Sequence, residues 1–134
     1  MSKKKQKRYH SEIYYPSWAE TSLNAFIAEL RAKKALNFSV HSIVKIVQYS
    51  FDYGKQLLKY LLKSINVQSL SSGTVFEFYS FGERISKACF RVSFNEFPVD
   101  LVLVISADGT VITVFTTNKH DNHDSLNVEL YEKG

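Results

Sequence analysis

The sequence predicts one α+β domain in which two N-terminal helical segments pack on a four-stranded antiparallel sheet. Apolar residues recur at helical intervals between residues 17 and 65, and at two-residue intervals between residues 74 and 117. A polar stretch over residues 69–73 separates the two patterns. The pair Asp108-Gly109, which lies between two apolar runs, is typical of a hairpin turn. These observations favour a layer of helices followed along the chain by an antiparallel meander.

The first helix is expected to begin just after Pro16, because a proline disfavours helix in the residue before it. Ser17 and Glu20 have the spacing of a capping box, in which each side chain accepts a hydrogen bond from a free backbone N–H. An apolar face follows at helical intervals, formed by Leu23, Phe26, Ile27 and Leu30.

The second helical segment has Asn37 or Ser39 as its expected N-cap, is interrupted at Gly54 and continues to about residue 65. Its apolar residues are numerous enough to form a broad face: Ile43, Val44, Ile46, Val47, Phe51, Leu57, Leu58, Leu61, Leu62 and Ile65. Another face carries a row of lysines at four-residue spacing, which either faces phosphate groups or is simply the solvated side of the helix: Lys55, Lys59 and Lys63.

Four strands are expected over residues 74–81, 86–94, 99–106 and 110–117. The third of these is almost wholly apolar after its second residue, which favours a central place in the sheet. In the second strand alternate residues point to opposite faces, so the charged ones lie together on one side. With the helices on the other face, this side is open, and it carries Lys87 and Arg91 together with Thr113 of the last strand.

A chain of 134 residues with 45% hydrophobic residues can build one core, and one domain is expected over residues 17–134, after a basic, flexible tail over residues 1–16. The tail holds five of the 17 basic residues, which leaves 12 basic against 13 acidic residues elsewhere. Such a tail either contacts nucleic-acid phosphates or remains solvated. Its cations are Lys3, Lys4, Lys5, Lys7 and Arg8.

The lone Cys89 cannot form a disulfide within the chain, and we expect it to serve packing in a cytoplasmic protein. No apolar run reaches the roughly 18 residues that a membrane span requires, so no membrane partner is expected. His41 is expected to be structural or at the surface, and His10 to be exposed beside the tail.

A polar cluster follows the last strand and includes His120, Asp121, His123 and Asp124. Imidazole and carboxylate groups can move protons near neutral pH, because an unperturbed histidine titrates around pH 6.5. The same cluster could be an ordinary surface loop, or could bind a divalent metal ion. The sequence has no second histidine pair or cysteine cluster to complete a zinc site, so no metal ion or other cofactor is expected.

Cleavage of RNA without a metal ion fits this cluster beside an open, basic sheet face. RNA carries its own nucleophile, the 2′-hydroxyl, so the protein must supply proton transfer and cations that hold the charge of the phosphate. In this interpretation His123 or His120 moves the proton, Arg91 binds phosphate through its planar guanidinium group, and Lys87 or Lys119 adds charge. Exposed tyrosines would stack on unpaired bases. The alternative is that Lys87 and Arg91 are ordinary solvent-facing residues.

The segment from residue 87 to residue 131 resembles small phage, prophage and toxin proteins. They share a Lys-x-x-x-Arg strand, an Asp-led apolar strand, a Thr-containing last strand and an Asn-x-x-Asp-x-His-x-x-Leu-x-x-x-x-Tyr tail. The matching residues are Lys87, Arg91, Asp100, Thr113, Asn118, Asp121, His123, Leu126 and Tyr131. The order of helices before a four-stranded sheet is also similar to the wider group of barnase, EndoU, colicin and RelE ribonucleases, including MqsR-like toxins. The chain departs from the closer pattern at Phe115, Ser125 and Asn127, where Trp, Thr and Asp are expected.

The resemblance implies a metal-independent endoribonuclease, as in a toxin that cleaves mRNA or tRNA and is held inactive by an antitoxin or immunity protein. It implies a catalytic group of His123, Arg91 and Lys87, with Asp121 at a matched position, whereas His120 is a catalytic candidate only from its place in the polar cluster. RNA contacts are expected from Lys119, Asn118, Thr113 and the basic tail. Two alternatives remain open: a non-catalytic RNA- or ribosome-binding module, and a phage accessory protein that inhibits a host protein.

Overall fold

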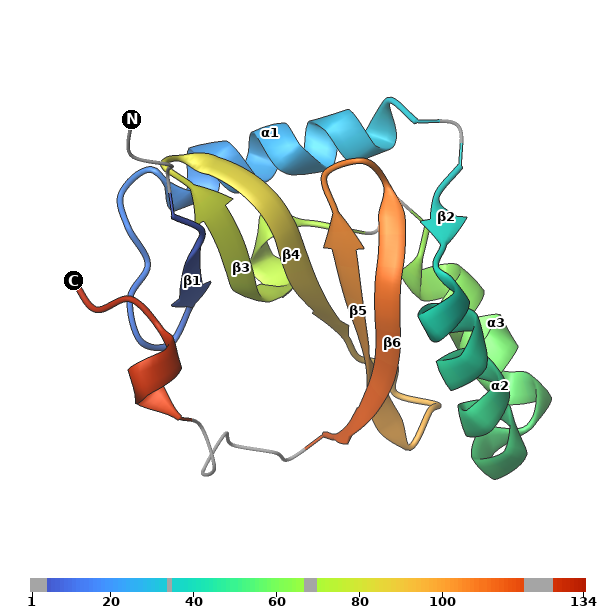
Figure 1. Cartoon of the computed structure of the whole chain (residues 1–134). Coiled ribbons are helices and arrows are strands. Elements are labelled where there is room, and N and C mark those ends of the chain that lie inside the picture. The colour runs from blue at the N-terminus through green and yellow to red at the C-terminus, as the bar shows by residue number, and fades with distance from the viewer. Residues whose placement is uncertain (1–4, 34, 67–69, 120–126) are drawn as a thin grey trace.

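The computed structural model describes residues 5–33, 35–66, 70–119 and 127–134. Within them the chain is α+β, with three α-helices and one six-stranded mixed sheet (Figure 1). The strand order is β1-β3-β4-β5-β6-β2, and only β2 runs parallel to its neighbour. The α+β class is therefore confirmed, whereas the expectation of two helical segments on four antiparallel strands is wrong in detail.

The meander expected in the second half of the chain is present. It consists of β3 (Val75–Phe81), β4 (Arg84–Val92), β5 (Val99–Ser106) and β6 (Thr110–Asn118), each antiparallel to the next. Gly109 has the positive φ that the turn between β5 and β6 requires, so the hairpin at Asp108-Gly109 is confirmed. The third expected strand, β5, is central, with β4 and β6 on its two sides.

Two short strands extend the meander at its edges, and neither was expected. β1 (Lys7–His10) pairs antiparallel with β3, and β2 (Asn37–Phe38) pairs parallel with β6. Residues 7–10 of the expected flexible tail over residues 1–16 thus belong to the sheet as β1. Both strands are too short to show a two-residue period, and each forms only by pairing with a partner more than 60 residues away.

Helix α1 (Ala19–Arg31) starts close to the expected position but without the expected capping box. Trp18 is its N-cap residue and makes no side-chain cap hydrogen bond. Helix α2 (Val40–Tyr53) is capped by Ser39, whose hydroxyl accepts a hydrogen bond of 3.0 Å from the Ser42 N–H, as one of the two expected alternatives. Gly54, with φ of 66°, ends α2 and precedes α3 (Lys55–Ser64).

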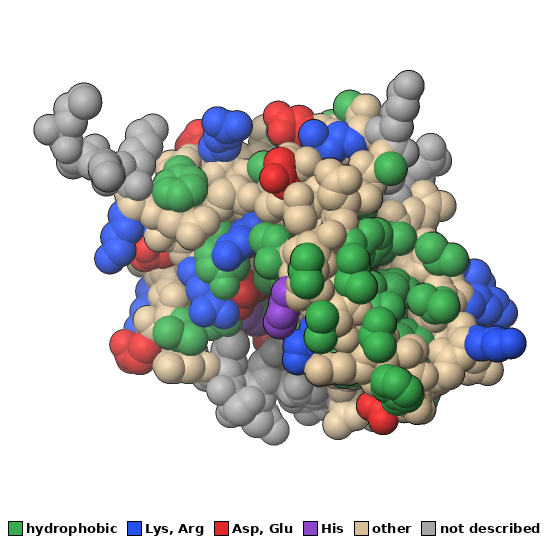
Figure 2. All heavy atoms as spheres, turned by 45° about the vertical axis from the view of Figure 1, so that its right-hand side comes forward, with side chains coloured by type: hydrophobic (Ala, Val, Ile, Leu, Met, Phe, Trp, Pro, Cys, Tyr) green, Lys and Arg blue, Asp and Glu red, His purple; other side chains and the backbone are tan. Residues whose placement is uncertain are grey.

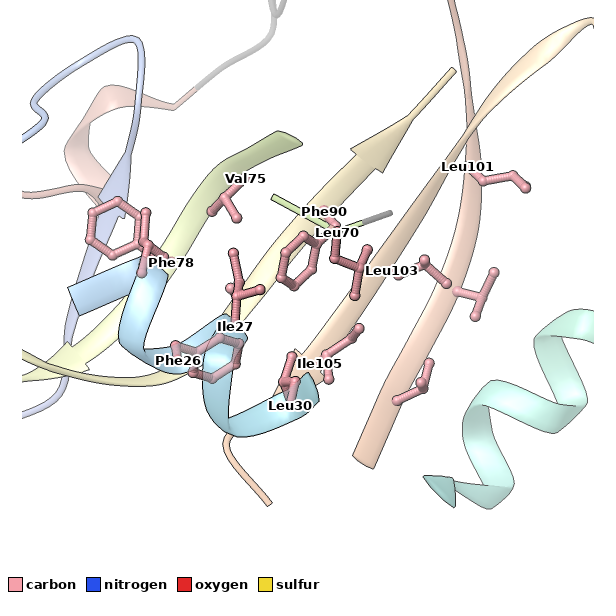
Figure 3. Packing of buried hydrophobic residues seen from close by; sticks show 14 of the residues in the cluster. Phe26, Ile27, Leu30, Leu70, Val75, Phe78, Phe90, Leu101, Leu103 and Ile105 are labelled. Carbon is pink, nitrogen blue, oxygen red and sulfur yellow. The ribbon is translucent and has the colours of Figure 1, made fainter. Parts of the chain in front are cut away.

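The core lies between one face of the sheet and helices α1 and α3. Figure 3 shows Phe26, Ile27 and Leu30 of α1 packed toward the side chains of the central strands. Helix α3 adds Leu57, Tyr60 and Leu61, and the ring of Tyr60 lies 5.0 Å from that of Phe94 and 5.1 Å from that of Phe97. Helix α2 lies beside β6 (Figure 1). The opposite face of the sheet is not covered by α1, and we call it the open face.

The broad apolar face expected on the second helical segment does not all reach the core. In α2, Ile46 packs against the core, but Ile43, Val44, Val47 and Phe51 are at least 46% exposed. No helix in the described residues is both long and apolar enough to cross a membrane.

Candidate nucleic-acid interface

Strand alternation places a set of charged and hydroxyl side chains on the open face. On β4 these are Lys87, Cys89 and Arg91, while the intervening Ala88 and Phe90 are buried in the core. The register then aligns them with partners on the neighbouring strands: Tyr79 opposite Lys87, Glu77 opposite Cys89, and Val102 opposite Arg91. Arg8 of β1 lies opposite Tyr79, which extends the same row to the edge of the sheet.

Arg91 is held at one end of this face by two hydrogen bonds. Its Nε donates to Oδ2 of Asp100 at 2.7 Å, and its Nη2 donates to the backbone carbonyl of Asn118 at 2.8 Å. The Asp100 residue is 5% exposed, and its other oxygen, Oδ1, accepts no hydrogen bond within the described part of the chain. A buried carboxylate beside an arginine fixes the guanidinium plane, and Oδ1 is itself buried and has no hydrogen-bond donor among the described residues.

A pocket of about 630 Å³ opens next to this pair, and we call it the Arg91 pocket. It is lined by Arg91 of β4, Ser93 just after that strand, Asp100 of β5 and Lys119, together with residues of the loop after β1, of the 3₁₀ turn η1 (Ser72–Thr74) and of the start of β3. The volume falls within the range of small-ligand sites. Lys119 donates a hydrogen bond to the backbone carbonyl of Phe94. Two cations, the buried carboxylate of Asp100 and the exposed carboxylate of Glu12 therefore line the same space.

A second group of polar side chains, the Glu77 cluster, lies further along the open face. The carboxylate of Glu77 is buried, with 6% of the residue exposed, and accepts hydrogen bonds from Arg8 at 2.9 Å, from Tyr79 at 3.2 Å and from the hydroxyl of Tyr131. The Cys89 thiol lies at 3.5 Å from the same carboxylate. Four donors around one carboxylate offset the cost of burying its charge.

The Glu77 cluster keeps its acidic hydroxyl and thiol groups protonated at neutral pH. Burial, together with its hydrogen bond to Glu77, raises the pKa of Tyr131 to about 12. Burial and the nearby charge of Glu77 also raise the pKa values of Tyr79 and Cys89 well above their ordinary values. Cys89 is thus a buried thiol without nucleophilic character, in agreement with the packing role expected for it.

Lys87 and Arg8 both lie over aromatic rings of this face. The Lys87 Nζ is 4.3 Å from the centre of the Tyr79 ring, and Arg8 Cζ is 4.7 Å from that of Tyr131. Cation–π contacts of this kind orient a basic side chain without neutralising its charge. Lys87 is half-buried, so it remains accessible to an anion from solvent.

Only part of the expected site falls within the described residues. His120, Asp121 and His123 lie outside them, as do Lys3 and Lys4. Lys5 and Lys7 are exposed near the edge of the sheet. Arg8 was expected to be a free tail cation, but it is partly buried in an ion pair with Glu77.

The remaining expected residues lie on or near the open face. Thr113 is half-buried opposite Val104. Asn118 is exposed at the end of β6, where its carbonyl holds Arg91. Lys87 and Arg91 share this face, as expected, but they belong to different groups of side chains. Lys87 lies over Tyr79 of the Glu77 cluster, whereas Arg91 lines the Arg91 pocket.

Three residues of this face were missed or misplaced from the sequence. His10 was expected to be exposed, yet it is 1% exposed, with its ring 5.3 Å from that of Tyr131. Glu77 sits in a strand of apolar residues, and a lone acidic residue at such a position is the signal that was available. Tyr131 appeared only as a matched position in the family resemblance.

No three His, Cys, Asp or Glu side chains gather as metal ligands in the part of the chain that the structure describes. Scans against protein-family models, curated proteins and solved structures found no match for this chain.

Proposed function

We propose that this protein is a metal-independent endoribonuclease that binds single-stranded RNA across the open face. The observation that carries the proposal is the Arg91 pocket, where the buried carboxylate of Asp100 holds Arg91 and where Lys119 adds a second cation. A ribonucleotide offers an anionic phosphate for these cations and, in its 2′-hydroxyl, the nucleophile of the reaction. A DNA strand lacks that hydroxyl.

Arg91 retains donors for a phosphate after its two internal contacts. A guanidinium group has five N–H bonds, and the hydrogen bonds to Asp100 and Asn118 use two of them. The ion pair with Asp100 holds the group in one orientation, so little conformational entropy is lost when a phosphate binds. Lys119 adds a second charge on the same side of the pocket.

The proposed reaction is attack of the 2′-hydroxyl oxygen on the adjacent phosphorus. The proton of that hydroxyl passes to a base, and the 5′-oxygen leaves with a proton, which gives a 2′,3′-cyclic phosphate and a 5′-hydroxyl end. Asp100 would hold the guanidinium group of Arg91 in place for the phosphate. The resemblance assigns proton transfer to His123, with His120 and Asp121 beside it in the sequence. Lys87 would hold a neighbouring phosphate further along the strand.

The test is cleavage of an end-labelled single-stranded RNA by the purified full chain in the presence of EDTA. We expect a ladder of products with 2′,3′-cyclic phosphate ends and no cleavage of the DNA strand of the same sequence. His123→Ala should abolish cleavage. Lys119→Ala should slow it by about 10-fold or more, because the phosphate loses one of the two cations that bind it. Circular dichroism would show that both variants remain folded.

Lys63→Ala is the matched control, because Lys63 is an exposed lysine on α3, away from the Arg91 pocket. It should cleave RNA at the rate of the unaltered chain. Absence of cleavage under all conditions, cleavage that EDTA abolishes, or equal cleavage of RNA and DNA would each contradict the proposal.

A non-catalytic RNA-binding module is the second candidate, and the exposed lysine row on α3 favours it: Lys55, Lys59 and Lys63. Binding through such a row depends steeply on salt concentration, because each phosphate contact releases counterions. Replacing the three lysines by glutamine should then weaken RNA binding strongly and flatten its salt dependence. An endonuclease that works through the open face would keep most of its activity. Deleting residues 1–8 is a poor test, because it removes part of β1.

A further inference from the structure

Helix α2 is apolar on two sides, although only one of them is covered. Its inner side packs against the sheet and the core through residues such as Ile46, Tyr49 and Tyr53. Its outer side has no polar residue along a stripe at helical spacing: Val40 (79% exposed), Ile43 (50%), Val44 (46%), Val47 (50%) and Phe51 (84%). The polar residues of α2 lie on a third side, with His41, Lys45, Gln48 and Asp52, whereas an amphipathic helix normally turns its apolar residues to the core. The outer stripe of α2 therefore has the composition of an interface.

The exposed apolar surface extends beyond α2. On α3, Leu58 is 49% exposed and Leu62 is 64% exposed, and Phe115 of β6 is 36% exposed. Figure 2 shows hydrophobic side chains gathered into a broad area on the side of the molecule that α2 forms, with basic side chains at its rim. Single exposed hydrophobic residues are normal on protein surfaces, but a contiguous area of this kind marks an interaction site. We call it the α2 patch.

The charges around the α2 patch favour an acidic partner over a second copy of this chain. Residues 40–64 contain four lysines and one aspartate, a net charge of +3 with histidine neutral. Two copies joined through this surface would bring like charges together, which opposes association. A partner with carboxylates flanking its apolar residues would instead meet opposite charge on α3, where Lys55 and Lys59 are exposed within four residues of Leu58 and Leu62, respectively.

The shape of the stripe also selects the kind of partner. From residue 40 to residue 51 a helix rises about 16 Å, or three turns, which matches one face of an amphipathic helix of about 11 residues. Helices pack through apolar residues at positions i, i+3, i+4 and i+7, the same spacing that the stripe itself has.

We propose that the α2 patch docks an amphipathic helix of a partner protein, with acidic residues flanking its apolar face. The patch continues toward the open face, because Phe115 on β6 lies opposite Val102, which in turn lies opposite Arg91. A partner seated on α2 would therefore also shield the open face from RNA. This last step rests on the proposed endoribonuclease function, whereas the docking itself does not.

The probe is a fluorescein-labelled synthetic helix with leucines at i, i+3, i+4 and i+7 and glutamates on both flanks. We expect the full chain to bind it with a Kd in the micromolar range, measured by fluorescence anisotropy. The double variant Val47→Ser/Phe51→Ser should weaken binding by at least about tenfold. Phe81→Ser is the control, since Phe81 is a 41% exposed aromatic residue outside the patch, and it should bind normally.

Three outcomes would overturn the docking proposal. The first is no binding of the peptide, or equal binding of a peptide with lysines in place of the glutamates. The second is a dimer in solution that Val47→Ser/Phe51→Ser converts to a monomer, which would assign the patch to a second copy. The third is binding to vesicles containing anionic lipid that the same double variant abolishes, which would assign it to a membrane surface.

The binding assay contains no RNA, so its result is independent of the endoribonuclease proposal. If the peptide binds but the chain does not cleave RNA, the docking proposal stands and the shielding role fails. If both hold, saturating peptide should reduce RNA cleavage by the unaltered chain and leave cleavage by Val47→Ser/Phe51→Ser unchanged.

Discussion

Charged residues are usually exposed and large apolar residues usually buried, and two surfaces of this molecule break this rule in opposite ways. They are the open face of the sheet and the outer side of α2. On the open face, charged groups are buried and held by partners, as Glu77 is by Arg8 and Tyr131. On α2, large apolar side chains such as Val47 and Phe51 are exposed. The first arrangement is stabilised within the chain, whereas the second lacks an internal partner among the described residues.

This difference separates two kinds of surface. A buried, hydrogen-bonded carboxylate contributes to the fold and positions cations at the same time, so its loss should cost stability. An exposed apolar stripe contributes little to the fold, so its loss should affect association alone. Unfolding free energies from urea denaturation can therefore test the comparison directly, from the largest expected effect to the smallest.

Glu77→Ala should give the largest loss, about 2–4 kcal/mol of unfolding free energy, because it leaves Arg8 without its ion-pair partner and removes the acceptor of two tyrosine hydroxyls. The control is Glu83→Ala, at an exposed position between β3 and β4. Its unfolding free energy should stay within about 0.5 kcal/mol of that of the unaltered chain. A stable Glu77→Ala variant would show that the Glu77 cluster does not hold the sheet edge.

Asp100→Asn should cost about 1–3 kcal/mol of unfolding free energy, because Arg91 loses its negatively charged partner while the side-chain volume is kept. The control is Asp52→Asn at an exposed position of α2, where no measurable change is expected. A neutral result for Asp100→Asn would mean that water replaces the carboxylate at Arg91 and that the pair is not a fixed feature of the site.

The sequence was sufficient for the long, periodic elements and insufficient for the short ones. The four strands of the meander were predicted to within two residues at every boundary, since alternation over seven or more residues is a strong signal. β1 and β2 have four and two residues, and their pairing is a property of the assembled sheet. The capping box at Ser17 failed because correct spacing does not ensure that the helix starts at that residue.

The sequence predicted which face of the sheet carries the candidate site, but it did not predict the contacts that the side chains of that face make. Alternation alone placed Lys87 and Arg91 on one side of β4, but only the register of β4 with β3 and β5 revealed which carboxylates hold the face together. Glu77 and Arg8 are 69 residues apart, and no local pattern connects them. Likewise, the apolar residues of α2 indicated a helix without showing that its outer side would remain uncovered.

Alkaline pH should destabilise the chain through the Glu77 cluster. The pKa of Tyr131 is raised to about 12 in the folded chain, against about 10 when unfolded, so the folded state holds this proton more tightly. The stabilisation is complete below pH about 10 and is lost as the pH rises toward 12. Between about pH 10 and pH 12 the unfolding free energy of the unaltered chain should fall by about 1–2 kcal/mol more than that of Tyr131→Phe. The phenylalanine variant has no hydroxyl proton to lose at this position. Equal losses in both would place the titrating group elsewhere.

Phe51→Ser should have the smallest effect on stability, less than about 0.5 kcal/mol, because Phe51 is 84% exposed and both residues have similar helix propensity. Ile46→Ser, on the core side of the same helix, should cost about 1–3 kcal/mol through lost packing. Urea unfolding of the two variants compares the two sides of α2 within one element. If Phe51→Ser were as destabilising as Ile46→Ser, the outer side of α2 would already be occupied within the chain, and no surface would remain there for a partner.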